Sequence, residues 1–184
     1  MLRAKKGWFQ VGLLVGVLLV GNSAVAAATC TNYIYGTSGN DTLLGTPAND
    51  CSYGYAGDDT IYGTQGDDEL YGGPGNDNLQ GGDGFDYLYG DTGYDTLDGG
   101  AKADVVDGWT EDDVVGGGYG NDTAVLGYSG NDDVSGNQDN DSLYGEDGND
   151  TLHGNSGTDY GDGGAGTDSC GDGLETSVNC EIFF

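Results

Sequence analysis

An aspartate recurs with a fixed nine-residue period along most of this chain, each time five residues after a glycine. Fifteen such pairs run from Gly36 and Asp41 to Gly163 and Asp168, and thirteen of the fourteen steps are nine residues long. Aspartate is a poor strand former, and glycine loses much entropy on ordering, so their periodic use must serve something other than a hydrophobic core. Carboxylates at a fixed spacing can bind cations, and a fixed period of this length is typical of a solenoid.

Each nine-residue unit divides into a turn and a strand. The first six positions, as in Gly36–Asp41 (GTSGND), hold turn-forming residues, and the last three form a very short strand whose middle residue is apolar in most repeats, for example Leu43 and Ile61. Two repeats then make one coil of 18 residues. Stacked coils form two parallel sheets around a thin line of Leu, Ile and Val. The sequence therefore predicts an all-β fold, a parallel β-roll (β-solenoid) of two-repeat, 18-residue coils.

Stacking also predicts two separate columns of aspartates, because the turns of every second repeat lie above one another. Carboxylates ~5 Å apart in a column repel each other unless a cation lies between them. Glycine-rich turns expose carbonyl oxygens beside the carboxylates, and a flexible cage of mixed oxygen ligands is what Ca²⁺ prefers, whereas Mg²⁺ demands a stricter octahedron. No cluster of soft ligands favours zinc or copper. The predicted ligands are, in one column, Asp41, Asp59, Asp77, Asp95, Asp113, Asp132, Asp150 and Asp168, and in the other, Asp50, Asp68, Asp86, Asp104, Asp122, Asp141 and Asp159.

The charge balance supports cations as partners. The chain has 32 acidic residues against four Lys and Arg, three of which lie in the first six residues. Such an excess of negative charge excludes nucleic acid and anionic membrane surfaces as partners. One apolar residue per nine is also too small a core to stabilise a domain, so we expect the chain to fold only when Ca²⁺ binds.

The N-terminal 28 residues are predicted to be a secretory signal peptide. Basic residues are followed by an apolar stretch of about 13 residues, which is short for a membrane span, and then by small residues that offer cleavage after Ala26 or Ala28. An uncleaved anchor is the alternative. We therefore expect a secreted, extracellular protein with no membrane contact after cleavage, and a mature net charge of 1 − 32 = −31.

Four cysteines fall as two local pairs, one at each end of the repeats. An exported chain meets an oxidising compartment, and Cys30–Cys51 with Cys170–Cys180 is the simplest of three possible pairings. The predicted organisation is a signal peptide (1–28), an N-terminal cap (29–35), the roll (36–171) and a C-terminal cap (172–184). The final residues, Glu181-Ile182-Phe183-Phe184, look like the ending of some C-terminal export signals, but a cap that closes the roll is the preferred interpretation.

The repeats resemble the repeats-in-toxin (RTX) nonapeptide G-G-x-G-x-D-x-U-x of the hemolysin-type calcium-binding proteins. The resemblance covers Gly36 to Gly171, and fifteen copies in near-constant register make it specific. It implies a parallel β-roll with Ca²⁺ between stacked turns. It also implies that the aspartates at position six are side-chain ligands and that turn carbonyls complete each shell.

Several repeats depart from this motif. Position four is a glycine in 11 of 15 repeats. In one of the other four it is Lys102, whose positive charge lies beside a proposed site and should weaken calcium binding there. Three of the four exceptions lie in the second column, which we therefore expect to bind less well. Leu126 is the extra residue of the one ten-residue repeat and is predicted to form a bulge. Of at most thirteen sites between turns, we expect about eight to eleven to bind Ca²⁺. The exceptions at position four are Ala48, Lys102, Glu111 and Asp139.

An enzyme is not expected. The only histidine, His153, occupies an outward strand position, and the nine-residue period explains the paired carboxylates that a glycosidase would need. The predicted function is a structural, matrix or surface-associated role in the extracellular space. The alternative is a calcium-dependent adhesin for carbohydrate or a cell-surface polymer, with a ladder of outward tyrosines as the contact. A broken file of threonines on the other sheet makes an ice-binding face a weaker hypothesis. The ladder comprises Tyr53, Tyr71 and Tyr89, with Tyr144 later, and the file comprises Thr42, Thr60 and Thr96.

Overall fold

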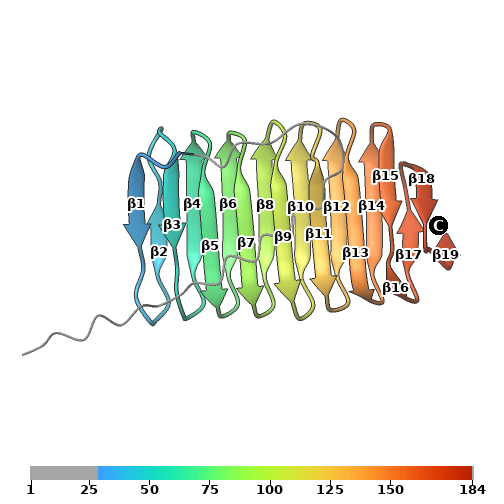
Figure 1. Cartoon of the computed structure of the whole chain (residues 1–184), viewed down its shortest axis with the longest axis horizontal. Coiled ribbons are helices and arrows are strands. Elements are labelled where there is room, and N and C mark those ends of the chain that lie inside the picture. Colours follow the sequence, from blue (N-terminus) through green and yellow to red (C-terminus); the bar gives the residue numbers. More distant parts are fainter. Residues whose placement is uncertain (1–28, 184) are drawn as a thin grey trace, which may run out of the picture.

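The protein is a rod of stacked coils built from two parallel β-sheets (Figure 1). The computed structural model describes residues 29–183. Residues 1–28, to which the signal peptide is assigned, and residue 184 lie outside the described residues. Each coil contributes one strand to each sheet, and the strands of the two sheets run in opposite directions (Figure 1). This arrangement confirms the predicted all-β parallel β-roll.

The first sheet contains ten strands, in which neighbours along the rod come from successive coils. Nine of them follow one another along the rod, and β16 pairs with β13 beside this path. They are β1 (Asn32–Tyr35), β3 (Asp50–Tyr53), β5 (Glu69–Pro74), β7 (Tyr87–Thr92), β9 (Val105–Thr110), β11 (Ala124–Ser129), β13 (Ser142–Gly148), β15 (Asp159–Asp162) and β18 (Leu174–Val178), with β16 (Ala165–Gly166).

The second sheet contains nine strands and faces the first across the core. Each of its strands except the last, β19, lies between two strands of the first sheet in the sequence. They are β2 (Thr42–Leu44), β4 (Thr60–Gln65), β6 (Asn78–Asp83), β8 (Thr96–Ala101), β10 (Val114–Tyr119), β12 (Asp133–Gln138), β14 (Thr151–Ser156), β17 (Ser169–Gly171) and β19 (Ile182–Phe183). Residues 29–183 contain no helix that could cross a membrane.

Most strands are longer than the sequence predicted. The prediction was three residues per strand, but β4 to β12 are all six residues long because each continues through the first three positions of the next repeat. Parallel pairing needs only backbone groups, so glycine at these positions does not interrupt it: Gly82 of β6 pairs with Thr64 of β4 and with Gly100 of β8. The turn proper is therefore confined to the last three of the six positions assigned to it.

The core is a single file of apolar side chains between the sheets. Two repeats have no apolar residue at the core position, which is Ser52 in one and Gly161 in the other. Leu174 of β18 fills the second gap, since a Cβ on Gly161 would lie 2.9 Å from its Cδ1. The file is Leu43, Ile61, Leu70, Leu79, Leu88, Leu97, Val106, Val115, Val125, Val134, Leu143, Leu152 and Cys170.

The extra residue of the ten-residue repeat is not where the sequence placed it. Leu126 was predicted to bulge, but it pairs regularly with Asp107 on one side and Tyr144 on the other. The extra residue is Thr123, which lies between the column residue Asp122 and the start of β11. A residue added in the turn leaves the ladder intact, whereas a bulge would have disrupted it.

Both predicted disulfides are present, and no described cysteine is free. Cys30–Cys51 ties the segment before β1 to β3, and Cys170–Cys180 ties β17 to the segment before β19. Their Cα atoms are 5.6 and 5.8 Å apart, as is usual for disulfides. Each bridge therefore fastens one end of the rod.

Candidate metal centre

The structure brings all fifteen predicted aspartates into two columns. In each column the backbone N–H of one aspartate donates a hydrogen bond to Oδ1 of the aspartate in the next coil, as from Asp77 to Asp95 at 2.7 Å and from Asp86 to Asp104 at 2.8 Å. Thirteen such bonds, 2.7–2.9 Å long, connect the columns from end to end. Each carboxylate after the first of its column is thus held at one oxygen by the coil before it.

The second oxygen has no partner except in the first aspartate of each column, Asp41 and Asp50, where Thr37 and Thr46 donate to it. In thirteen aspartates Oδ2 is buried without a hydrogen bond, although buried polar atoms are rarely left unsatisfied. An ionised oxygen in such a place costs several kcal/mol unless it is paired or coordinates a metal. The thirteen belong to Asp59, Asp68, Asp77, Asp86, Asp95, Asp104, Asp113, Asp122, Asp132, Asp141, Asp150, Asp159 and Asp168.

Carbonyl oxygens lie beside these unpartnered atoms. A Cβ built on Gly81, the first residue of its repeat, would fall within 3.0 Å of both Oδ2 of Asp86 and the carbonyl oxygen of Gly99 in the next coil. The same pair of oxygens flanks seven further first-position glycines. Any other residue would fill this space, which explains why position one is glycine in every repeat. A carboxylate and a carbonyl oxygen on one small cradle are the hard donors that Ca²⁺ takes.

Burial also raises the pKa of these aspartates. The pKa of Asp77 is raised to about 6 and that of Asp113 to about 8, first by loss of hydration and then by repulsion from column neighbours, against the lowering effect of the backbone hydrogen bond. Because these folded pKa values lie above the ordinary value of 3.8, folding without metal becomes less favourable as the pH rises towards neutral. At neutral pH the columns therefore oppose the fold unless a cation neutralises them.

The donor set fits calcium. The position-six aspartates would hold the ion through Oδ2, and turn carbonyls would complete its shell. A bound Ca²⁺ supplies positive charge between successive carboxylates and so replaces their mutual repulsion with attraction. The identity of each ligand and the expected eight to eleven ions remain predictions.

A second side-chain ladder was not foreseen. At position five, the side-chain oxygen of an Asn or Asp accepts a hydrogen bond from the backbone N–H one coil further on, as from Asn149 to Asn131 and from Asn76 to Asp58. In this ladder each N–H donates to the preceding coil, whereas in the aspartate columns each N–H donates to the next coil. The sequence contained a signal for this ladder, because position five is Asn or Asp in ten of fifteen repeats.

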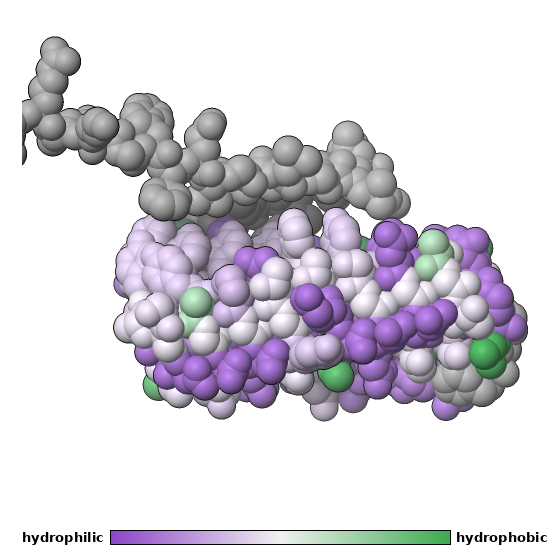
Figure 2. Space-filling model, turned by 90° about the horizontal axis from the view of Figure 1, so that it is seen from below, coloured by the Kyte–Doolittle hydropathy of each residue, from purple (hydrophilic) through white to green (hydrophobic). Residues whose placement is uncertain are grey.

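Seen from below, strongly hydrophilic residues form a band along much of the rod (Figure 2).

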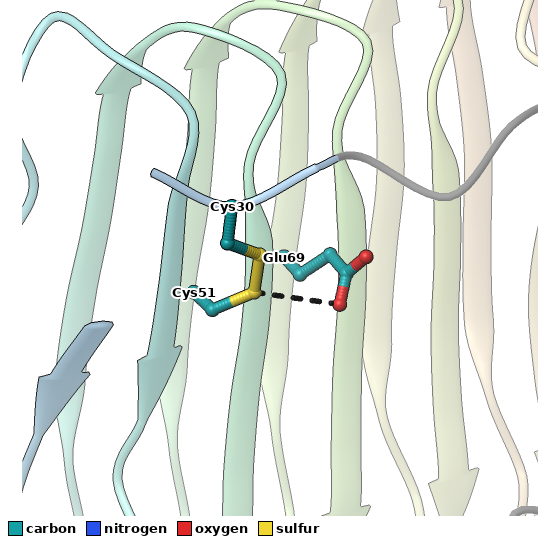
Figure 3. Close-up of side chains that lie close together, drawn as sticks. All are labelled: Cys30, Cys51 and Glu69. Carbon is teal, nitrogen blue, oxygen red and sulfur yellow. Dashed lines mark hydrogen bonds between the residues drawn. A yellow bond between two sulfur atoms is a disulfide. The ribbon is translucent and has the colours of Figure 1, made fainter. Parts of the chain in front are cut away.

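A third group of possible ligands lies at the N-terminal end. Cys30, Cys51 and Glu69 bring their ligand atoms within 4.8 Å of one another, and Sγ of Cys51 is 3.5 Å from Oε2 of Glu69 (Figure 3). The two sulfurs are joined as a disulfide, however, and a metal requires the thiolates. This group is therefore a disulfide with a neighbouring glutamate and not a metal site.

Lys102 keeps the backbone of the turn although it replaces a glycine. Its φ is +84°, a conformation that glycine adopts without cost, and its Nζ lies 5.1 Å from the centroid of the Phe85 ring. Its charge lowers the pKa of Asp86, whose raised value is otherwise due first to burial. The weaker site expected here thus has two separable causes, the charge and the missing glycine.

Replacing Lys102 tests this interpretation. Lys102→Gly is expected to raise calcium affinity at the adjacent site by about three- to tenfold, because it removes a competing cation, and to relieve about 1 kcal/mol of backbone strain. Isothermal titration calorimetry and thermal unfolding in 1 mM Ca²⁺ measure the two effects. Lys102→Gln is the matched control for charge and should reproduce the part of the gain in affinity that is due to the charge, without the relief of backbone strain. Unchanged affinity in both variants would show that Lys102 does not weaken the site.

A family model supports the calcium assignment. The RTX calcium-binding nonapeptide repeat (4 copies) matches residues 31–61, 53–88, 89–124, 126–160 and 135–170, which together span most of the chain. No curated protein sequence matches the chain.

Proposed function

The chain belongs to the family of RTX calcium-binding nonapeptide repeat proteins, and on this premise we propose that it is a secreted protein whose roll folds when Ca²⁺ binds. The observation that carries the proposal is the set of thirteen buried, unpartnered Oδ2 atoms. A folded core that buries so many unsatisfied carboxylates needs an equal supply of positive charge, and Lys102 is the only Lys or Arg after residue 28.

We propose a structural or surface-associated role outside the cell and no catalytic activity. The family and the two disulfides suggest an extracellular protein. The calcium-facing carboxylates are committed to the fold, which leaves them unsuited to acid–base chemistry. His153 lies in β14 in regular register with Ser135, as expected of a strand residue in a repeat.

The test is a calcium titration followed by far-ultraviolet circular dichroism, with Mg²⁺ as the control cation. We expect a cooperative gain of β signal near millimolar Ca²⁺ and none with Mg²⁺, because Mg²⁺ gives up its waters reluctantly. A flat response to Ca²⁺ would refute the proposal. An equal response to both ions would mean that the columns respond to divalent charge and do not select calcium.

A calcium-dependent carbohydrate or cell-surface adhesin is the second candidate, and an aromatic face favours it. The residues of this face belong to or adjoin strands of the first sheet, and none of them is buried. Aromatic rings with an exposed face can dock sugar rings. The face comprises Tyr33, Tyr35, Tyr53, Tyr55, Tyr71, Tyr87, Tyr89, Trp109, Tyr128, Tyr144 and Tyr160.

The packing of the tyrosine ladder, in contrast, favours a structural role for these side chains. The ring centroids of Tyr53 and Tyr71 are 4.9 Å apart with an interplanar angle of 1°, and those of Tyr71 and Tyr89 are 5.0 Å apart. Parallel rings this close leave no room for a sugar between them. Tyr33 and Tyr35, at 58% and 57% exposure, lie at the end of the rod and are the better contacts for a glycan.

Two sets of substitutions separate the roles. Tyr71→Leu is expected to lower the free energy of unfolding in Ca²⁺ by about 1–2 kcal/mol, because it removes two ring contacts, and to leave retention on a glycan column unchanged. Tyr33→Ser with Tyr35→Ser is expected to abolish any retention. Because it also removes the ring contacts of Tyr35 with Tyr53 and Tyr55, a loss of stability similar to that of Tyr71→Leu is expected, and only the loss of retention separates the two variants. Retention that survives the double substitution, or is absent from the wild-type chain, would count against the adhesin.

A further inference from the structure

The last coil of the roll contains no nonapeptide repeat, yet each aspartate column continues by one carboxylate. The backbone N–H of Asp168 donates to Oε2 of Glu181 at 2.8 Å, and that of Asp159 donates to Oε2 of Glu175 at 2.6 Å. These bonds repeat the 2.7–2.9 Å bonds between successive aspartates. Each glutamate therefore stands where the next column aspartate would stand.

The carbonyl oxygen that lies beside each aspartate Oδ2 in the ordinary coils also has a counterpart in the last coil. A Cβ on Gly154 would lie 2.8 Å from both Oδ2 of Asp159 and the carbonyl oxygen of Gly173. A Cβ on Gly163 would likewise fall within 3.0 Å of Oδ2 of Asp168 and of the carbonyl oxygen of Asn179. The two carbonyls occupy the places that first-position glycines hold in the ordinary coils.

The C-terminal ends of the two columns share one short sequence pattern. Gly173-Leu174-Glu175 and Asn179-Cys180-Glu181 each place the carbonyl two residues before the carboxylate, whereas the nonapeptide places it five residues before. Both carbonyl residues have positive φ, +86° and +53°, and both middle residues pack against the core. Because three residues are missing from the turn, the longer side chain of glutamate spans the distance that aspartate spans elsewhere.

Unpartnered buried oxygens point to a ligand at both places. Asp159 and Asp168 are 2% and 0% exposed, and Oδ2 of each is buried without a hydrogen bond. The carboxylates of Glu175 and Glu181 bring a second negative charge to each position. Without a cation these charges would repel the buried aspartates.

We propose that Glu175 and Glu181 complete one further calcium site at the C-terminal end of each column, between Asp159 and Glu175 and between Asp168 and Glu181. The proposal rests on the proposed function, since it extends the same columns. It raises the largest number of sites between carboxylates from thirteen to fifteen. It also makes calcium a further link between strands β18 and β19 and the roll, beside strand pairing and the Cys170–Cys180 disulfide.

The experiment counts calcium in four variants of the secreted chain. Glu175→Gln, Glu181→Gln and the double variant keep an oxygen that accepts the backbone hydrogen bond but lose the charge. Glu146→Gln, at an exposed glutamate of β13 in an ordinary coil, is the matched control. Bound Ca²⁺ is measured by equilibrium dialysis with atomic emission, and hydrogen–deuterium exchange is followed over residues 159–183.

We expect each single variant to bind one ion fewer than the wild-type chain, the double variant two fewer, and the control the same number. Exchange should rise only over residues 159–183. A double variant with the wild-type count and protection would overturn the proposal and leave the proposed function standing. A wild-type chain that binds no calcium would refute the proposed function itself.

Failure to fold is also informative. A variant that is unfolded in 1 mM Ca²⁺ is re-measured at 10 mM, where mass action on the remaining sites compensates for one lost ion. Refolding with one ion fewer supports the proposal. A chain that stays unfolded contradicts it, because the loss of one site among many cannot remove the whole fold.

Discussion

Removing calcium with a chelator is expected to unfold most of the roll. Extracellular calcium modules bind at roughly 10⁻⁴–10⁻³ M. With about 1 mM Ca²⁺ and a Kd of ~0.1 mM, each site contributes roughly 1.4 kcal/mol. Ten sites contribute on the order of 14 kcal/mol, which is comparable to the net stability of a whole domain. The apolar core is a single file of side chains and cannot replace this contribution.

Small-angle X-ray scattering and circular dichroism measure this unfolding. We expect the radius of gyration to rise and the β signal to fall in EGTA, and both to recover when Ca²⁺ is restored. The two disulfides connect residues within each end of the chain and should not keep the middle folded. A chain that stays rod-shaped in EGTA at neutral pH would show that calcium is not what stabilises the roll.

The second large effect is that replacing Asp104 is expected to destabilise the fold with calcium and to stabilise it without calcium. Burial raises the pKa of this carboxyl to about 8, so its ionised form opposes the metal-free fold at neutral pH. Asp104→Asn keeps an oxygen for the N–H of Asp86 and removes the charge. In 1 mM Ca²⁺ we expect a loss of about 2 kcal/mol, since the residue borders two sites of the column and Lys102 weakens one of them. In EGTA we expect a gain in stability, because position 104 no longer carries a charge that burial disfavours.

Two unfolding series measure the reversal. Urea unfolding in 1 mM Ca²⁺ gives the first value, and folding driven by trimethylamine N-oxide in EGTA gives the second, since this osmolyte favours the buried state. Asp83→Asn, at an exposed aspartate of β6, is the control and should change neither value by more than about 0.5 kcal/mol. Destabilisation under both conditions would mean that Asp104 stabilises the fold by itself and that the column is not a calcium site.

The fold could be predicted because its signal is repeated along the chain. A single error in one repeat does not change the period, so the coil length, the two sheets and the two aspartate columns follow from residues such as Gly81 and Asp86. The local pairing of the cysteines follows from the same regularity, since each pair lies at one end of the repeats. The misplaced Leu126 shows the limit: a ten-residue repeat reveals that a residue is extra, but the backbone decides whether Thr123 or Leu126 leaves the ladder.

Other features depend on contacts between coils that the period does not specify. The strands proved longer than three residues because backbone pairing continues through glycines, and a strand-forming side chain is not needed there. The tyrosine ladder follows from register, but the closeness of the rings of Tyr53 and Tyr71, which hides their faces, depends on side-chain packing.

The sequence by itself determined that calcium-binding carboxylates recur in two columns on a β-roll, because side-chain type and spacing are all that such columns require. Only the tertiary structure decided which oxygen of each aspartate is held by the backbone and which is left for an ion. It also decided where the columns end. Glu175 and Glu181 lie outside the nonapeptide period, and only the fold brings their carboxylates under Asp159 and Asp168.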